Sequence, residues 1–311
     1  MIKINTTQTI VDNFYNSIVK LFENKLSKTE NKKLKWKIEL KAIDKLLTDK
    51  LKNFDKYISF EKIIKADFSY MKELVEFLDK HPQRYGLSPQ EKDYFLTMYL
   101  RLKKADFIKQ LNIQVCPYCN RNYIFNFSKN NQQEATAQLD HFFDKKDYPY
   151  LAVSLYNLVP SCSTCNQRKS SKREDIFYPY LESFNDSAKF KYKGIKPFLE
   201  GEKIKFLDSK RVMFDIEAIK DIDKVKKHIE VFNLKNLYDE HKDIVSELLQ
   251  KAEIYNESYI DELFNRYEGT LFMNREDLLR LVTCGYVTDE ELHKRPLSKL
   301  IKDISEELGL V

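Results

Sequence analysis

Hydrophobic residues in the first part of the chain recur every three or four positions, with charged and polar residues between them. The clearest runs lie at residues 10–22 and 40–51, and this period is that of a helix with one buried face. The segment from Ser88 to Glu91 supplies an N-cap, a first-turn proline and the third-position acid of a capping box. We therefore predict a helix that begins there, with an apolar-periodic run to Phe107.

The pattern changes after residue 110. Residues 123–127 are β-branched and aromatic, and residues 135–143 have a similar character, which predicts two short strands joined by the polar stretch 128–133. The residues that follow Cys165 are polar and compatible with a helix. The order we expect is strand, turn, strand, long loop, helix.

The last third of the chain is mixed at first and then helical. Residues 190–192 and 203–206 alternate like short strands, and the helical period returns from residue 216, most clearly at 237–249. Six glycines and eight prolines in 311 residues favour helix over loop. The predicted fold class is α+β, a mostly helical chain with a small central core.

Length and charge bound the picture further. A chain of 311 residues is long for one core, and we expect three regions, at residues 1–110, 111–175 and 176–311. The net charge of +5 is only a mild basic bias and says little about partners. No apolar run approaches the roughly 18 residues that a membrane span needs, and the start does not resemble a secretory signal. We expect a cytoplasmic protein.

Four of the five cysteines form two Cys-x-x-Cys pairs, Cys116 with Cys119 and Cys162 with Cys165. Each pair can present two sulfurs to one ion, and four thiolates form a closed, structural zinc site. Four free buried cysteines or a redox pair are the alternatives, and the matched spacing favours zinc. Cys284 has no partner in the sequence and is expected to be a small buried hydrophobe.

Between the cysteine pairs lie Asp140, His141 and Asn157, and Asn166 follows the last cysteine. The order Cys-x-x-Cys, Asp-His, Asn-Leu-Val-Pro, Cys-x-x-Cys-Asn-x-x-Lys resembles the HNH endonuclease family in its four-cysteine ββα-metal version. The resemblance covers about residues 114–173. It implies that this core hydrolyses phosphodiester bonds with one divalent ion.

The chemistry of these residue types fits that reaction. Water must lose a proton to attack a phosphodiester, and His141 can accept it near neutral pH. Asp140 and Asn166 offer hard oxygen ligands suited to Mg²⁺ or Mn²⁺, and the resemblance implies the same roles. It also implies that Asn157 braces the loop and the catalytic histidine. Adjacent strand residues point to opposite faces, so the strand must end or twist between Asp140 and His141.

Basic residues follow the last cysteine pair. Asn166, Lys169, Ser170 and Arg173 would share one face of a helix, which predicts that Lys169 and Arg173 hold phosphates beside the scissile one. The stretch Lys32 to Lys37 is basic too, although a solvated face is the simpler interpretation. His228 lies among lysines and is expected to be solvated.

The long helical flanks suggest a partner. Four-cysteine HNH proteins with such flanks resemble the nuclease components of Septu-type anti-phage systems, which act beside an ATPase. The expected function is therefore a DNA endonuclease in antiviral defence, with RNA as a substrate left open. The alternative is a zinc-stapled module that binds nucleic acid, or serves as an adaptor, without catalysis.

Overall fold

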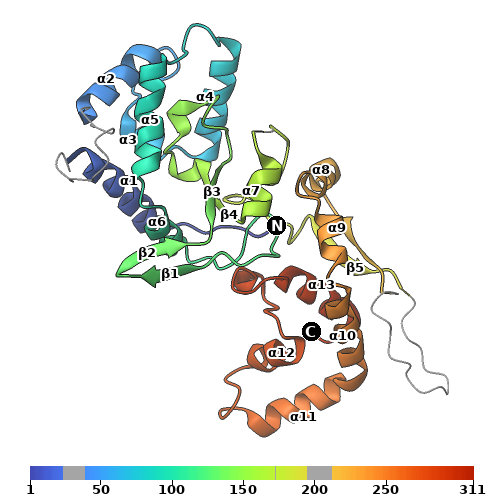
Figure 1. Cartoon of the computed structure of the whole chain (residues 1–311). Helices are drawn as coiled ribbons and strands as arrows, with labels where there is room; N and C mark the ends of the chain where they lie inside the picture. The colour runs from blue at the N-terminus through green and yellow to red at the C-terminus, as the bar shows by residue number, and fades with distance from the viewer. Residues whose placement is uncertain (24–38, 172, 195–211) are drawn as a thin grey trace.

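The structure is a computed structural model, and it describes residues 1–23, 39–171, 173–194 and 212–311. Helices dominate it, with three small antiparallel sheets of two strands each among the described residues, so the predicted α+β class is confirmed. Figure 1 shows the N-terminal helices at one end, the C-terminal helices at the other, and the cysteine-bracketed core between them. The basic stretch Lys32 to Lys37 and the predicted strand at 203–206 lie outside the described residues.

The N-terminal helices follow the apolar period of the sequence closely. They are α1 (Gln8–Glu23), α2 (Leu40–Leu51), α3 (Phe60–Ile64), α4 (Phe68–Lys80), α5 (Pro89–Arg101) and α6 (Lys104–Leu111). The predicted capping box is present, with the Ser88 hydroxyl accepting from the backbone of Glu91 and the Glu91 carboxylate accepting from that of Ser88. The helix ends earlier than predicted, because Leu102 adopts an extended conformation and α6 begins a new helix.

The central core differs from the predicted strand order. Residues Asn126–Lys129 (β1) and Gln132–Ala135 (β2) form one hairpin, closed by Asn130 and Asn131 in the left-handed conformation. Gln138–His141 (β3) then pairs with Leu158–Ser161 (β4), a segment that we had placed in the long loop. All four residues of β4 are buried, so the strand lacks the polar alternation by which an exposed strand is recognised. Two 3₁₀ turns, η1 (Pro149–Leu151) and η2 (Leu155–Asn157), occupy the loop, and α7 (Ser163–Lys169) follows β4.

The C-terminal part contains the third sheet and a group of helices. The predicted strand at 190–192 is β5 (Ala188–Tyr192), and it pairs with β6 (Phe214–Ala218). The helices that follow are α8 (Ile222–Phe232), α9 (Leu234–Asp239), α10 (Lys242–Ile254), α11 (Glu257–Tyr267), α12 (Arg275–Thr283) and α13 (Ser298–Leu308), with the 3₁₀ turn η4 (Asp289–Glu291) before α13. None of the described helices has both the length and the apolar character for crossing a bilayer.

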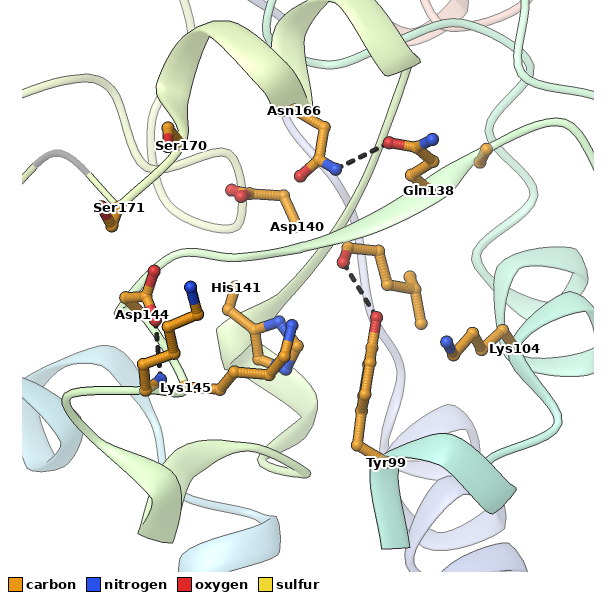
Figure 2. Close-up of a pocket in the computed structure, with 13 residues that line it drawn as sticks. Tyr99, Lys104, Gln138, Asp140, His141, Asp144, Lys145, Asn166, Ser170 and Ser171 are labelled. Atoms are coloured by element: carbon orange, nitrogen blue, oxygen red, sulfur yellow. Dashed lines mark hydrogen bonds between the residues drawn. The ribbon is translucent and has the colours of Figure 1, made fainter. Parts of the chain in front are cut away.

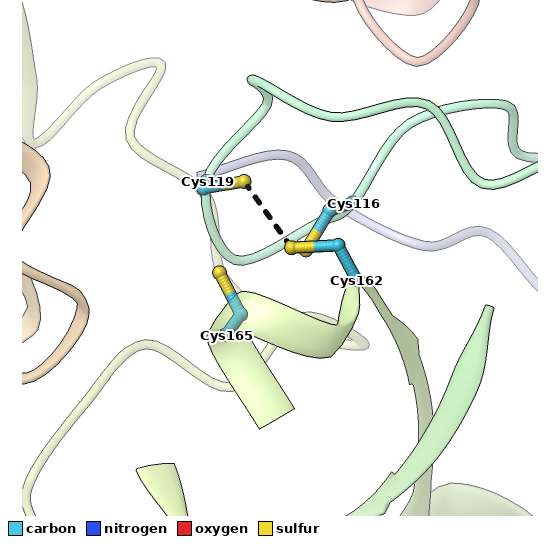
Figure 3. A group of neighbouring side chains, drawn as sticks. All are labelled: Cys116, Cys119, Cys162 and Cys165. Atoms are coloured by element: carbon cyan, nitrogen blue, oxygen red, sulfur yellow. Dashed lines mark hydrogen bonds between the residues drawn. The ribbon is translucent and has the colours of Figure 1, made fainter. Parts of the chain in front are cut away.

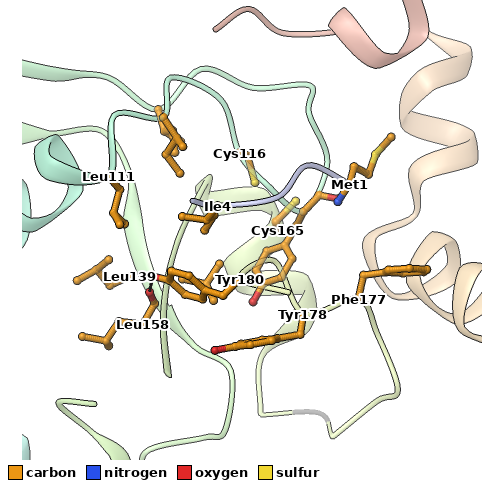
Figure 4. Packing of buried hydrophobic residues seen from close by; sticks show 14 of the residues in the cluster. Met1, Ile4, Leu111, Cys116, Leu139, Leu158, Cys165, Phe177, Tyr178 and Tyr180 are labelled. Atoms are coloured by element: carbon orange, nitrogen blue, oxygen red, sulfur yellow. Dashed lines mark hydrogen bonds between the residues drawn. The ribbon is translucent and has the colours of Figure 1, made fainter. Parts of the chain in front are cut away.

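The start of the chain passes through the middle of the molecule. Ile2 donates its backbone N–H to Pro117, and Ile4 donates to Pro179, so the first residues lie between the first cysteine pair and the segment around residue 180. Ile4 is buried in the same cluster as Leu139 and Tyr180, as Figure 4 shows. This cluster also contains residues of the N-terminal helices and of the C-terminal ones. The core is therefore supported from both ends of the chain.

Two residues that we expected to lie elsewhere are placed differently. His228 is fully buried, and its Nε2 donates to the carbonyl of Tyr118 at 2.9 Å, so the expectation of a solvated side chain was wrong. The ring fits there because Phe177, Phe184 and Phe232 surround it. Cys284 is exposed rather than buried, because it ends α12 in the left-handed conformation.

Candidate metal and catalytic sites

The four paired cysteines converge in one buried cluster. The sulfur atoms of Cys116, Cys119, Cys162 and Cys165 all lie within 4.8 Å of one another, as Figure 3 shows. A tetrahedral zinc site with bonds of about 2.3 Å has sulfurs about 3.8 Å apart, and the Cys119 and Cys162 sulfurs are 4.0 Å apart. The cluster therefore has the donor set and the near-tetrahedral spacing to hold zinc, and its four thiolates leave no position for a substrate.

Local backbone geometry holds the cysteines in place. The first pair lies on a tight turn, in which Asn120 donates its N–H to the carbonyl of Cys116 at 2.8 Å. In the second pair, Cys162 is the N-cap residue of α7 and Cys165 lies in the first turn of that helix. The Asn122 amide nitrogen donates to the Cys162 sulfur at 3.2 Å. A zinc ion here would join the start of the core to the start of α7.

Asp140 lies on β3, is buried, and forms part of the wall of a cavity. The Tyr118 hydroxyl donates to its Oδ2 at 2.7 Å, and the Lys169 ammonium lies 3.1 Å from the same oxygen. Burial raises the pKa of the Asp140 carboxyl, while Lys169 and Tyr118 oppose that shift. Both partners fix the carboxylate, and Oδ1 keeps lone-pair capacity because its hydrogen bond from Lys169 is long, at 3.4 Å.

His141 follows Asp140 and points to the other side of the strand, toward Tyr99, as Figure 2 shows. The strand ends at His141, so both side chains still line one cavity. The His141 Nε2 is 3.0 Å from the carbonyl of Ala152, and because a carbonyl only accepts, this nitrogen is the donor. Burial, followed by the positive charge of Lys145, lowers the pKa of His141 to about 3. The neutral ring therefore keeps its lone pair on Nδ1.

Asn157 fastens the loop between β3 and β4. Its amide nitrogen donates to the carbonyls of Phe143 and Leu151, and its amide oxygen accepts from the backbone of Phe143 at 2.7 Å. Its backbone carbonyl accepts from Phe142, the residue after His141. These contacts agree with the bracing role that the family resemblance implies.

Asn166 lies on α7, directly after Cys165, and reaches the cavity from the side opposite His141. Its amide nitrogen donates to the Gln138 side chain at 2.7 Å, which leaves the amide oxygen for another ligand. Figure 2 shows Asn166 beside Asp140. A strand and a helix thus bring Asp140, His141 and Asn166 to one cavity of about 450 Å³.

Other charged residues line the same cavity. Lys104 comes from the start of α6, while Asp144, Lys145 and Lys146 come from the loop after β3. Burial, helped by Lys145, lowers the pKa of Lys104. Three ammonium groups near two carboxylates make the cavity suited to an anion such as a phosphodiester.

The two residues predicted to hold phosphates have other neighbours. Lys169 is 3% exposed, and its ammonium donates to the carbonyl of His141 at 2.8 Å as well as to Asp140. Ser170 has a positive φ of 49° and ends α7, so Arg173 does not lie on that helix. Arg173 instead pairs with Asp79 of α4 at 2.8 Å. In this conformation Lys169 positions Asp140, and Arg173 ties the core to the N-terminal helices.

Several residues that line the cavity or contact its lining residues had not been predicted from the sequence. Tyr118, inside the first cysteine pair, touches Asp140 from a position 22 residues earlier. Gln138, Asp144 and Lys104 carry no motif that spacing alone could reveal. The alternation along β3 was the one available signal, because Gln138 lies two residues before Asp140.

The chain is similar to Septu protein PtuB from Bacillus thuringiensis. The two are 25% identical over 211 residues, which cover 61% of this chain and 76% of the relative. No family model matches the chain, and no solved structure matches it. The sequence similarity thus extends well beyond the cysteine-bracketed core.

Proposed function

We propose that this chain is a metal-dependent endonuclease of the HNH type that hydrolyses phosphodiester bonds of DNA. The observation that carries the proposal is the meeting of Asp140, His141 and Asn166 in one cavity beside the four-cysteine cluster. These residues come from two separate places in the sequence, the end of β3 and helix α7, and each has the chemistry that the reaction requires.

His141 is the proposed general base. Its Nε2–H is held by the Ala152 carbonyl, so Nδ1 carries the lone pair that would accept a proton from water. With its pKa at about 3, the free imidazole stays neutral at physiological pH. A weakly basic imidazole becomes more basic when an anionic phosphate lies beside it, because the negative charge stabilises the imidazolium.

Asp140 and Asn166 are the proposed ligands of a Mg²⁺ or Mn²⁺ ion. The Asp140 Oδ1 and the Asn166 amide oxygen are hard donors of the type these ions prefer. Such an ion would offset the negative charge that develops on the phosphate and the leaving oxygen. Asp140 is already held by Tyr118 and Lys169, so it would meet the ion without reorganisation.

The three lysines of the cavity are the proposed phosphate contacts, in place of Lys169 and Arg173. Lys104 and Lys145 both contribute to the lowered pKa of His141, so their charge is felt at the base. An ammonium group so placed attracts a phosphodiester strand and neutralises the phosphates beside the one that is cut.

The similarity to Septu protein PtuB supports a place for this chain in Septu-type anti-phage defence. We propose that it acts with a partner protein, an ATPase by the resemblance described above. Co-purification of the chain with the product of a neighbouring ATPase gene tests this part. A full-length chain that cuts DNA at its maximal rate alone would contradict a requirement for the partner.

Cleavage of plasmid DNA and of RNA, with Mg²⁺ or Mn²⁺ and with EDTA, tests the proposed activity. His141→Ala should lower the rate by about 10²–10⁴-fold and retain zinc, while His81→Ala, at an exposed position, should cut like the wild type. Wild-type cleavage by the His141 variant would show that His141 is not the base. Binding of nucleic acid without turnover in any metal would favour the non-catalytic module.

A further inference from the structure

Three aromatic residues of the central core lie on the surface at alternate positions. Tyr123, Phe125 and Phe127 are 44%, 45% and 43% exposed. Tyr123 and Phe125 lie in the segment that leads into β1, and Phe127 lies in β1 itself. Large aromatic side chains are usually buried because each removes a large apolar area from water. Three exposed aromatic side chains at alternate positions therefore indicate a binding surface.

The alternation places all three rings on one face of the chain. Ile124, between the first two, is buried, and the hairpin packs its other face against α6. The outward positions of the facing strand are exposed as well, at Gln132 and Glu134. The aromatic face is therefore the solvent side of the hairpin and not an unfinished piece of core.

Two of the three rings stack on each other. Tyr123 and Phe125 are stacked, with centroids 4.4 Å apart and an angle of 23° between the ring planes. Two bonds fix Phe125 to the neighbouring strand, one from its N–H to the Thr136 hydroxyl at 2.8 Å and one to its carbonyl from Thr136 N–H at 2.9 Å. A rigid pair of exposed parallel rings offers a π-face at little cost in entropy.

This face leads directly to the proposed catalytic cavity. The exposed positions continue from Glu134 through Thr136 to Gln138, and Gln138 lines the cavity and accepts from Asn166. The exposed face of the hairpin thus reaches Gln138, at the edge of the cavity that holds Asp140 and Asn166.

We propose that Tyr123 and Phe125 form a stacking platform for unpaired bases of the nucleic acid strand that enters the cavity. The proposal rests on the proposed nuclease function and adds its substrate class, a single-stranded or locally unpaired nucleic acid. Exposed rings stack on any base, and this stacking is insensitive to sequence. In a duplex, the neighbouring base pairs already cover the faces of each base, so the platform selects unpaired strands.

The composition of the face favours nucleic acid over a protein partner. The large apolar side chains on it are aromatic, and the other outward positions of the hairpin carry Lys129, Gln132 and Thr136. A protein interface of this kind would require a more continuous apolar centre. Glu134 lies opposite Phe127 in the pairing register, so its charge would repel phosphates from that end and leave the Tyr123 and Phe125 pair as the platform.

Binding measured without catalysis tests the platform. Fluorescence anisotropy with the full chain, in EDTA, compares a labelled oligo-thymidine strand with a duplex of equal length. The variant Tyr123→Ala/Phe125→Ala should bind the single strand roughly tenfold or more weakly and the duplex nearly as the wild type does. Tyr123→Phe/Phe125→Tyr should restore binding, because the rings remain.

The control is Leu271→Ala/Met273→Ala, which removes two apolar side chains that are even more exposed, 69% and 79%, between α11 and α12. It should leave both affinities unchanged. Unchanged single-strand binding by the Ala/Ala variant would overturn the platform and assign the face to a protein. An equal loss on duplex and single strand would overturn the selection for unpaired bases. A chain that binds single strands through these rings but cuts nothing would instead contradict the proposed nuclease.

Discussion

The four-cysteine cluster and the cavity that contains Asp140 lie close together, but they differ in their donor atoms and in their exposure to solvent. The cluster has four identical soft ligands, all buried and all within 4.8 Å of one another. The cavity offers two hard oxygen donors of different kinds, a carboxylate and an amide, and is also lined by three lysines. The first arrangement suits an ion held permanently as part of the fold, and the second suits an ion that arrives and leaves with a charged substrate.

The two sites are nevertheless joined by short connections. Helix α7 carries Cys165 and Asn166 side by side, one for each site. Tyr118 lies between the first two cysteines and donates its hydroxyl to Asp140. The geometry of the proposed catalytic site therefore depends on the two segments that carry the cysteines, and we expect the cysteine cluster to depend less on the proposed catalytic site. Substitutions should show this asymmetry.

The largest effect is expected from Cys162→Ser. A structural zinc contributes about 10–16 kcal/mol of apparent binding free energy in small zinc modules, which is comparable to the whole stability of a typical domain. We expect the variant to lose its zinc, measured by metal analysis, and its cooperative thermal transition. The control is Cys284→Ser, an exposed thiol, which should change stability by no more than about 0.5 kcal/mol. A Cys162→Ser variant with the thermal transition of the wild type would show that the fold does not depend on zinc.

A smaller effect, confined to the open site, is expected from Asn166→Ala. Loss of one of two proposed ligands should raise the Mg²⁺ concentration for half-maximal cleavage roughly tenfold or more, with zinc content and melting unchanged. Gln167→Ala, at the exposed neighbouring position, is the matched control. If the metal titration of the Asn166 variant matched that of the control, Asn166 would not be a ligand.

The smallest effect is expected from Tyr118→Phe, which removes only the hydroxyl that connects the sites. A hydrogen bond to a charged group contributes about 1.5–3 kcal/mol, so cleavage at fixed Mg²⁺ should fall about tenfold while zinc remains bound. Tyr180→Phe is the control, because that fully buried hydroxyl donates to the Leu158 carbonyl at 2.7 Å and not to Asp140. Equal losses of cleavage in both variants would indicate general destabilisation and would contradict the proposed connection between the two sites.

The sequence was most informative where the signal is local. The capping box at Ser88 and the apolar period of α1 and α2 depend on near neighbours, and the structure has those helices where they were predicted. The cysteine cluster could be predicted because metal ligands need a fixed residue type and a fixed spacing. In both cases the signal comes from residues that lie within a few positions of one another in the sequence.

What could not be predicted depends on contacts between distant segments. Strand β4 pairs with β3 across a loop and is buried throughout, so no alternation marks it. Lys169 turns inward because Asp140 lies behind it, and a lysine in a sequence does not disclose its partner. His228 is buried by phenylalanines from another segment, Phe177 and Phe184. The direction in which a side chain points and the residues that it contacts are fixed only when distant segments pack together.

Asn120, the residue after the first cysteine pair, has a consequence for the portability of the core. It is fully buried, donates its amide to the Leu292 carbonyl, and accepts from the backbones of Leu297 and Lys299. A fragment cut after α7 would leave these groups without partners, at about 1–3 kcal/mol for each buried group. The cysteine-bracketed core therefore depends on the C-terminal part of the chain for part of its stability. A stable fragment of this chain would have to contain the core and the C-terminal helices together.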